Sequence, residues 1–287
     1  MEEKYSSIIT PRNKLFEVNF KEIWDYRDLL VLFVKRDIVT SYKQTILGPL
    51  WWILQPSMTV IIYMVVFGGI AGIPTDGIPK PLFYLSGVCM WQYFSDCLNK
   101  TSNTFVSNSG IFGKVYFPRL IMPLESVISN LVRFGIQVGL FAVVYVFYAV
   151  SGTDVLPNGY LFLFPLLVVM LAGLALGFGI IISSMTTKYR DFQVLFTFLV
   201  SLWMYATPIV YPLSQVKGKV FGGIDLYSLM LLNPVTPVLD TFKHGALGAG
   251  EFVGWGWLAY SFAFMFAILA IGILIFNKVQ RNFMDTV

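Results

Sequence analysis

The chain alternates between long apolar stretches and shorter polar connectors. A helix rises about 1.5 Å per residue and needs about 20 residues to cross the hydrocarbon layer of a bilayer, which is roughly 30 Å thick. No water is present there to satisfy an open backbone. The pattern therefore predicts an all-α polytopic membrane protein with six transmembrane helices, at residues 51–73, 82–98, 124–150, 160–183, 194–211 and 253–276.

An amphipathic helix is predicted before the first span. Its apolar residues recur at steps of three, four or seven, and charged residues fall largely elsewhere on the helical wheel. We expect this helix to lie in the membrane interface, either as a lever that passes force to the first span or as a simple anchor on the headgroups. The apolar positions are Phe20, Ile23, Trp24, Val31, Val34, Ile38 and Tyr42.

The polar connector 107–123 retains five large apolar side chains. Such residues are uncommon in an exposed loop that has no partner. We predict a short amphipathic helix that docks onto another protein; a helix resting on the bilayer is the alternative. The five residues are Ile111, Phe112, Val115, Tyr116 and Phe117.

The segment between the fifth and sixth spans is long, and its two apolar pieces are each shorter than a full crossing. They occupy 226–232 and 235–239, with Pro237 expected to interrupt the second. Two re-entrant helices fit this pattern, because irregular backbone is tolerated at membrane depth where it lines a cavity or is buried in protein. A small external cap is the alternative.

Composition and the distribution of basic residues add an orientation. The chain is 56% apolar and only 13% charged, about half the charge of an ordinary soluble fold. Of its basic residues, sixteen fall on the side of the termini and four on the other side. Both termini are therefore expected in the cytoplasm, and no nucleic-acid partner is needed to explain a net charge of +4. The predicted parts are a cytoplasmic segment 1–49, a membrane domain 50–276 and a cytoplasmic tail 277–287.

Motifs for catalysis, nucleotide binding and metal binding are missing from the sequence. No G-x-x-x-x-G-K-[ST] occurs, so this chain is not expected to hydrolyse ATP. His244 has no Cys or Glu constellation near it, and Cys89 and Cys97 are about 12 Å apart along one helix, too far to pair. Asp96 is the only acid well inside a span, which disfavours a proton relay. A membrane-embedded transferase is one alternative, but it should show a cluster of acids or histidines at the interface, and the sequence has no such cluster. A passive channel is another alternative.

Aromatic residues form stripes on two of the predicted spans. Faces of sugar rings stack on aromatic rings, so an aromatic-lined passage suits a glycan; ordinary core packing is the alternative. The predicted translocation path consists of Trp52, Tyr63 and Phe67 on the first span and Phe192, Phe196, Trp203 and Thr207 along the fifth.

Five motifs together resemble a known family. They are GPLWWILQP at 48–56, KVYFPRLIMP at 114–123, KYRDF at 188–192, ATPIVYP at 206–212 and NPVTPVLDTFKHGALG at 233–248. With them, almost the whole chain resembles the permease subunit of ABC-2-type exporters, and within that family it is most similar to permeases for O-antigen or teichoic-acid polysaccharides. Exporters of drugs or lipids share the architecture and are the alternative.

The resemblance implies a homodimer in a bacterial inner membrane, bound to two copies of a separate ATPase that holds ATP and Mg²⁺; this chain itself needs no cofactor. It implies a lipid-linked polysaccharide as substrate, whose diphosphate would meet Arg36, Lys43 and Lys100. It also implies a cytoplasmic coupling helix in 108–122 and a second, smaller ATPase contact. The residues are Gly113, Lys114, Tyr116, Phe117, Pro118 and Arg119 in the first contact, and Lys188, Tyr189, Arg190 and Asp191 in the second.

Overall fold

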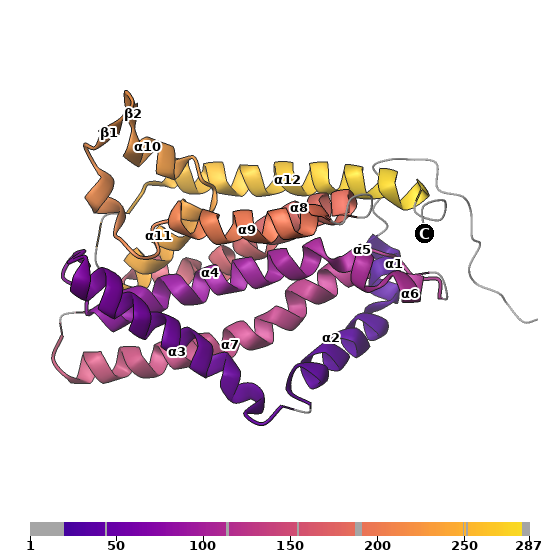
Figure 1. Ribbon diagram of the computed structural model, residues 1–287, viewed down its shortest axis with the longest axis horizontal. Helices are drawn as coiled ribbons and strands as arrows, with labels where there is room; N and C mark the ends of the chain where they lie inside the picture. The colour runs from indigo at the N-terminus through magenta and orange to yellow at the C-terminus, as the bar shows by residue number, and fades with distance from the viewer. Residues whose placement is uncertain are drawn as a thin grey trace, which may run out of the picture.

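The structure is a computed structural model that describes residues 20–43, 45–112, 115–153, 155–186, 191–248, 250 and 252–282. Long helices lie side by side and make up most of it (Figure 1). They are α3 (Trp51–Tyr63) with its π-helical continuation η2 (Met64–Ile70), α4 (Lys80–Ser102), α7 (Ile121–Val150), α8 (Phe164–Thr186) preceded by η3 (Gly159–Leu163), α9 (Asp191–Tyr205) and α12 (Trp255–Asn282).

Four helical stretches of the described chain are long and apolar enough to cross a membrane: Gly48–Ile70, Ile121–Val150, Gly159–Thr186 and Trp255–Val279. They coincide with four of the six predicted spans. The other two predicted spans are also helical, but α9 has only 15 residues and α4 carries more polar side chains. The helical class is confirmed, and the count of six crossings stays a prediction.

Helix α4 lies in the middle of the bundle (Figure 1), and most of its side chains are buried. It packs against both α7 and α8, and α8 in turn packs against α12. A helix enclosed by protein can carry polar groups at membrane depth, because neighbouring helices supply their partners. This explains why α4 is less apolar than the helices around it.

The predicted spans contain three pairs of glycines four residues apart, a spacing that predicts close helix contact: Gly68 with Gly72, Gly135 with Gly139, and Gly173 with Gly177. The structure confirms this contact for the pair on α8. A Cβ added at Gly177 would lie 2.7 Å from Cγ2 of Ile268 on α12, and one at Gly173 would meet Met265 at a similar distance. Gly135 and Gly139 on α7 have no such neighbour within 4 Å in this chain. Gly68 approaches Lys80 of α4, whereas Gly72 has no neighbour within 4 Å. Of the three pairs, only the α8 pair thus brings both of its glycines against another helix.

Both cysteines are buried in the core and unpaired. Cys89 and Cys97 lie about two turns apart on α4, as expected, and they pack against α7 through contacts near Gln137 and Val127. Their role in this structure is packing.

One end of the bundle carries the only sheet that the described residues form, and we call it the hairpin end. Strands β1 (Val220–Phe221) and β2 (Ile224–Asp225) pair antiparallel, after the short helix η4 (Leu213–Val216). Asp225 then caps α10 (Leu226–Leu231), since its carboxylate accepts from the backbone N–H groups of Tyr227 and Ser228. The Ser228 hydroxyl also donates to this carboxylate at 2.6 Å, and this bond, together with the two backbone bonds, holds the pKa of Asp225 below its ordinary value.

The second helix at the hairpin end is longer than the sequence pattern suggested. Helix α11 runs from Val235 to Leu247 without a break, so the expected interruption at Pro237 is wrong. Pro237 occupies the first turn, where the missing N–H would have had no partner within the helix. The helix ends at Gly248, whose φ of +66° closes it in the left-handed conformation.

The opposite end, which we call the α6 end, gathers short helices near the chain termini. They are α1 (Phe20–Asp25) and α2 (Arg27–Tyr42), which η1 (Gly48–Leu50) follows in sequence, and α5 (Thr104–Ser107) and α6 (Ser109–Phe112), which α7 follows. Helix α1 and the last turns of α12 lie at this same end (Figure 1). The first described helix and the end of the last one therefore share one end of the bundle. That both termini are cytoplasmic stays a prediction.

Helix α2 turns a different face to the bundle than the one predicted as apolar. Phe33 is buried against Phe117, with a ring-centroid distance of 5.8 Å, whereas Trp24 and Val31 are exposed. Of the other residues predicted on the apolar face, Tyr42 is exposed, and Ile23, Val34 and Ile38 are partly buried. The predicted location of this segment in the membrane interface stays a prediction.

Candidate functional site

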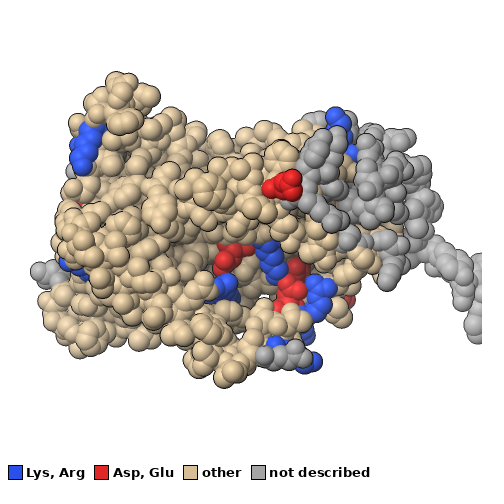
Figure 2. Space-filling view, viewed as in Figure 1, with Lys and Arg blue, Asp and Glu red and all other residues tan. Residues whose placement is uncertain are grey.

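A polar cavity of about 500 Å³ opens where α2, α4 and α7 meet. Charged atoms gather in a hollow over this region, while most of the same face is free of charge (Figure 2). The cavity is lined by Arg36, Asp37, Asn99, Lys100, Asn103, Ser107, Asn108, Ile111, Glu125 and Ser126. We call it the α6-end cavity.

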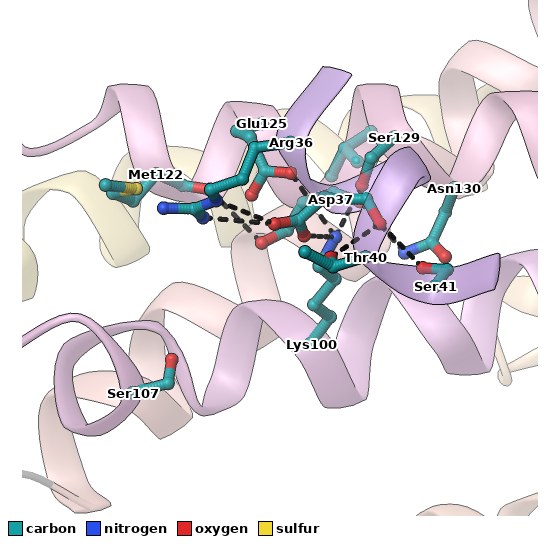
Figure 3. A network of polar contacts seen from close by, with 12 residues as sticks. Arg36, Asp37, Thr40, Ser41, Lys100, Ser107, Met122, Glu125, Ser129 and Asn130 are labelled. Carbon is teal, nitrogen blue, oxygen red and sulfur yellow. Dashed lines mark hydrogen bonds and ion pairs between the residues drawn. The ribbon is translucent and has the colours of Figure 1, made fainter. Parts of the chain in front are cut away.

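Lys100 is the centre of the charged network in this cavity (Figure 3). Its Nζ makes an ion pair with Asp37 of α2, lies 3.3 Å from Oε1 of Glu125 and donates to Oγ of Ser129 at 2.5 Å. Arg36 adds a second cation, since its Nη2 lies 3.0 Å from Oδ1 of Asp37. One lysine therefore ties three helices together.

Local sequence explains why these groups meet. Lys100 stands in the last turn of α4, where the helix dipole favours a cation. Glu125 and Ser129 are four residues apart on α7, so both project from one face. The Glu125 side chain is only 4% exposed, and a buried carboxylate is costly unless a cation accompanies it.

The charge state of Asp37 reflects its neighbours. Burial by itself would raise the pKa of this carboxyl, but the hydrogen bond and the positive charge of Lys100, with a further bond from Arg36, more than offset it. The pKa of Asp37 therefore lies below its ordinary value. The carboxylate stays ionised and keeps Lys100 in place.

A second polar group continues the network toward α3. Arg133 of α7 lies 3.0 Å from Oδ2 of Asp96 on α4 and donates to Oε1 of Gln55 on α3 at 2.7 Å. Between the two groups is a small cavity of about 70 Å³, which Trp52 also lines. Arg133 thus links the first span to α7 by a hydrogen bond and, through its ion pair with Asp96, to α4.

The predicted diphosphate-binding residues are brought together only in part. Arg36 and Lys100 both line the α6-end cavity, whereas Lys43 is exposed at the end of α2 and does not line it. The cavity also contains the carboxylates of Asp37 and Glu125. Its two cations are therefore balanced by two anions, and a phosphate group would have to compete for them.

The predicted coupling segment is partly described. Gly113, Lys114, Lys188, Tyr189 and Arg190 lie outside the described residues. Of the remainder, Tyr116 is 61% exposed, Phe117 is buried, and Pro118 and Arg119 are partly buried. Asp191 is exposed at the start of α9.

The apolar residues of this connector divide into two groups. Phe112 stacks on Phe117 at 5.7 Å between ring centroids, and the Arg119 guanidinium lies 5.7 Å from the Phe112 ring. Val115 and Tyr116 instead point away from the core, with exposed fractions of 57% and 61%. These two side chains form the part of the segment that is accessible to another protein.

The aromatic residues predicted on the first span stay near one another. Tyr63 and Phe67 meet edge to face with centroids 5.5 Å apart, and the Tyr63 hydroxyl donates to Sδ of Met204 on α9 at 3.1 Å. Trp52 lies nearer the α6 end, beside the small cavity. Tyr63 and Phe67 both pack against the core.

The residues predicted on the fifth span also make contacts within the subunit. Trp203 packs edge to face on Phe94 and Phe178, and its Nε1 donates to Oδ1 of Asn233 at 3.0 Å. Asn233 in turn donates to Oγ1 of the buried Thr207 at 2.9 Å. Phe192 and Phe196 stack on each other with centroids 6.0 Å apart. Their role as a passage stays a prediction.

Sequence reasoning missed three residues that the structure makes central. Asp37 and Glu125 are far apart in the chain and resemble ordinary charges at helix ends, although Glu125 does fall just inside a predicted span, which was a usable signal. Asn233 gave no signal beyond its position before Pro234, yet it joins α9 to the start of α11. Contacts between helices decide all three roles.

The arrangement is that of a helical membrane protein with polar groups enclosed between its helices, and the described residues contain no group of three or more His, Cys, Asp or Glu that could hold a metal ion. Comparison with known proteins then gives the family. Residues 28–247 match the family described as ABC-2 type transporter, and the chain belongs to it. It is a multi-pass permease of a bacterial inner membrane.

Named relatives cover most of the chain. It is 28% identical over 225 residues to an O-antigen export system permease protein RfbA of Myxococcus xanthus, covering 78% of this chain and 82% of that one. An RfbA of Klebsiella pneumoniae is 27% identical over 90% of this chain and 94% of its own length. The polysialic acid transport protein KpsM of Escherichia coli is 25% identical over 74% of this chain and 78% of its own.

Proposed function

We propose that this chain is the permease subunit of an ATP-driven exporter that moves a lipid-linked polysaccharide, of O-antigen or teichoic-acid type, from the cytoplasmic to the outer side of the membrane. The names of the relatives support the substrate class. The observation that carries the proposal is the α6-end cavity, because it offers two cations and several amides at the end of the bundle where a headgroup would arrive.

The diphosphate of the substrate binds by exchange in this proposal. Arg36 and Lys100 are paired with carboxylates in the absence of substrate, and a phosphate group replaces these carboxylates when the substrate binds. Arriving substrate therefore loosens α2 from α4 and α7. Binding and movement of the interface helix become one event, which favours its interpretation as a lever.

In this proposal, two copies of a separate ATPase bind a homodimer of the permease, and ATP hydrolysis by them drives transport. Val115 and Tyr116 contact the ATPase, together with Gly113 and Lys114. Exposed apolar side chains on α3 and α9, among them Ile62 and Leu202, face the second permease copy. Gating of the exit falls to α10 and α11 at the hairpin end.

The decisive experiment deletes the gene and measures undecaprenyl-linked polymer on the inner leaflet together with polysaccharide at the cell surface. We expect polymer to accumulate inside and to disappear from the surface. An unchanged surface polysaccharide, with loss of resistance to a drug or of a lipid from the outer leaflet, would favour an exporter of drugs or lipids instead.

The ATPase contact can be tested separately. Tyr116→Ala should reduce copurification of the ATPase, since it removes an exposed aromatic side chain at the contact. The matched control is Phe221→Ala, which removes an exposed aromatic side chain at the hairpin end. Equal ATPase recovery from both variants would remove this contact from the proposal.

A further inference from the structure

A second polar cavity lies at the hairpin end, and no predicted role falls on it. Its volume is about 250 Å³, and it is enclosed by the connector before α4, the segment around η4 and helix α11. One water needs about 10–15 Å³ of such space, so the cavity accommodates a group the size of a sugar ring. Its polar and aromatic lining includes Asp76, Phe83, Lys217, Tyr227, Asp240 and Lys243.

Lys243 is fixed in the wall of this cavity. It is 4% exposed, and its Nζ donates to the carbonyl oxygens of Pro208 at 2.7 Å and Ile209 at 3.3 Å. The same ammonium lies 3.9 Å from the centre of the Phe83 ring. Gly87 makes room for it, because a Cβ there would lie 3.2 Å from Cε of Lys243.

The two carboxylates stand in different environments. Asp76 has a φ of +51°, which a non-glycine residue adopts only when its surroundings impose it, and its carboxylate accepts from Oγ of Ser214 at 2.8 Å. Asp240 is partly buried on α11, and among the described residues none gives it a hydrogen bond or an ion pair closer than 4 Å. Its acceptors are therefore available to a ligand in the cavity.

The mixture of groups favours one class of ligand. Two carboxylates and two lysines leave no net charge, which disfavours a simple anion or cation, and charged walls disfavour an acyl chain. Sugar hydroxyls both donate and accept hydrogen bonds, so they match carboxylates and ammonium groups alike. Tyr227, whose ring lies 5.4 Å from Nζ of Lys217, adds an aromatic face for the ring C–H groups.

We infer that this cavity is a binding site for one neutral sugar unit at the exit side of the permease. The inference rests on the proposed function, because an exported glycan would supply that unit. Asp240 and Asp76 accept hydrogen bonds from its hydroxyls, Lys243 donates to them, and Tyr227 stacks against the ring. Tyr227 is on α10, and Asp240 and Lys243 are on α11. A bound sugar would therefore hold α10 and α11 in one position.

The test uses the purified full chain in detergent micelles and saturation-transfer NMR. The probes are the methyl glycosides of glucose, galactose, mannose, rhamnose and N-acetylglucosamine. We expect transfer to at least one glycoside, and binding at least tenfold weaker in Asp240→Asn and in Tyr227→Ala. Tyr227→Phe, which keeps the ring, should bind nearly as well as the natural chain.

The matched control is Lys219→Gln, which removes an exposed cation two residues beyond Lys217, outside this cavity. Its binding should be unchanged. Size-exclusion profiles and melting temperatures show that each variant is folded. Absence of transfer to all five glycosides, or equal transfer in Asp240→Asn and the natural chain, would overturn the assignment.

The outcome can be separated from that of the proposed function. If deletion of the gene stops polysaccharide export while no glycoside binds, the exporter stands and the cavity is not a sugar site. If a glycoside binds through Asp240 while surface polysaccharide is unaffected by deletion, the cavity stands and the exported substrate is a different one.

Discussion

Two lysines, one at each end of the bundle, are held in opposite ways. Lys100 at the α6 end is about one-third exposed and is paired with the carboxylates of Asp37 and Glu125. Lys243 at the hairpin end is almost fully buried and is held by the neutral carbonyls of Pro208 and Ile209. The first lysine is bound by side-chain carboxylates, and the second is bound by backbone oxygens.

The difference has mechanical consequences. Ion pairs between side chains on three helices can exchange partners, so the contact of α2 with α4 and α7 depends on what else enters the cavity. Backbone carbonyls cannot move away without unfolding the segment after α9. The α6 end is therefore suited to rearrangement, and the hairpin end holds its lysine in a fixed position.

The strongest test of this comparison is Lys243→Met. It leaves two buried carbonyl groups without donors, and each such loss costs about 1–3 kcal/mol. We expect the free energy of unfolding to fall by about 3 kcal/mol, measured as a lower melting temperature in detergent. Lys219→Met, which removes an exposed lysine, should leave it unchanged. A stable Lys243→Met variant would show that the carbonyls have other donors.

A smaller effect is expected from Lys100→Met. Breaking a fully buried ion pair costs about 3–5 kcal/mol, but Lys100 is partly solvated, so we expect a loss of about 2 kcal/mol. Adding Glu125→Gln should restore part of it, because the uncompensated carboxylate is then gone. Failure of the rescue would mean that Lys100 acts through packing alone.

The smallest effect concerns pH. The pKa of Asp37 is lower in the folded protein than its ordinary value of 3.8, so its contribution to stability is fully present above pH 3.8 and is lost as the pH falls through the lower folded value. Hydrogen exchange of α2 should therefore rise on acidification below pH 3.8, and more in the natural chain than in Asp37→Asn. Identical pH profiles would show that Asp37 does not hold α2.

Hydrophobic periodicity predicted the long helices because each of them has an apolar surface along its whole length, packed against other helices or facing lipid. The same reasoning correctly placed the close contact at Gly173 and Gly177. It was wrong at Pro237, since a proline rule for helix interiors does not apply to the first turn. The effect of Pro237 depended on its position in the first turn of α11, and the sequence pattern did not show where this helix begins.

The sites were harder to predict than the helices. Arg36 and Lys100 were expected to meet the diphosphate of the substrate. The structure pairs Lys100 with Asp37 and Glu125, which are remote from it in sequence, and pairs Arg36 with the adjacent Asp37. Lys243 entered the sequence argument only as one of the basic residues opposite the termini. Its burial follows from the meeting of α11, α4 and the segment after α9, which no local pattern encodes.

The burial of both native thiols gives the chain a practical property. Membrane-impermeant maleimides react with accessible cysteines, and Cys89 and Cys97 are only 2% and 0% exposed. The natural sequence thus provides an unlabelled background for site-directed alkylation. Tyr116→Cys and Val220→Cys, introduced singly at exposed positions, would report which compartment each end of the bundle faces. The two buried cysteines would not first have to be replaced by serine or alanine.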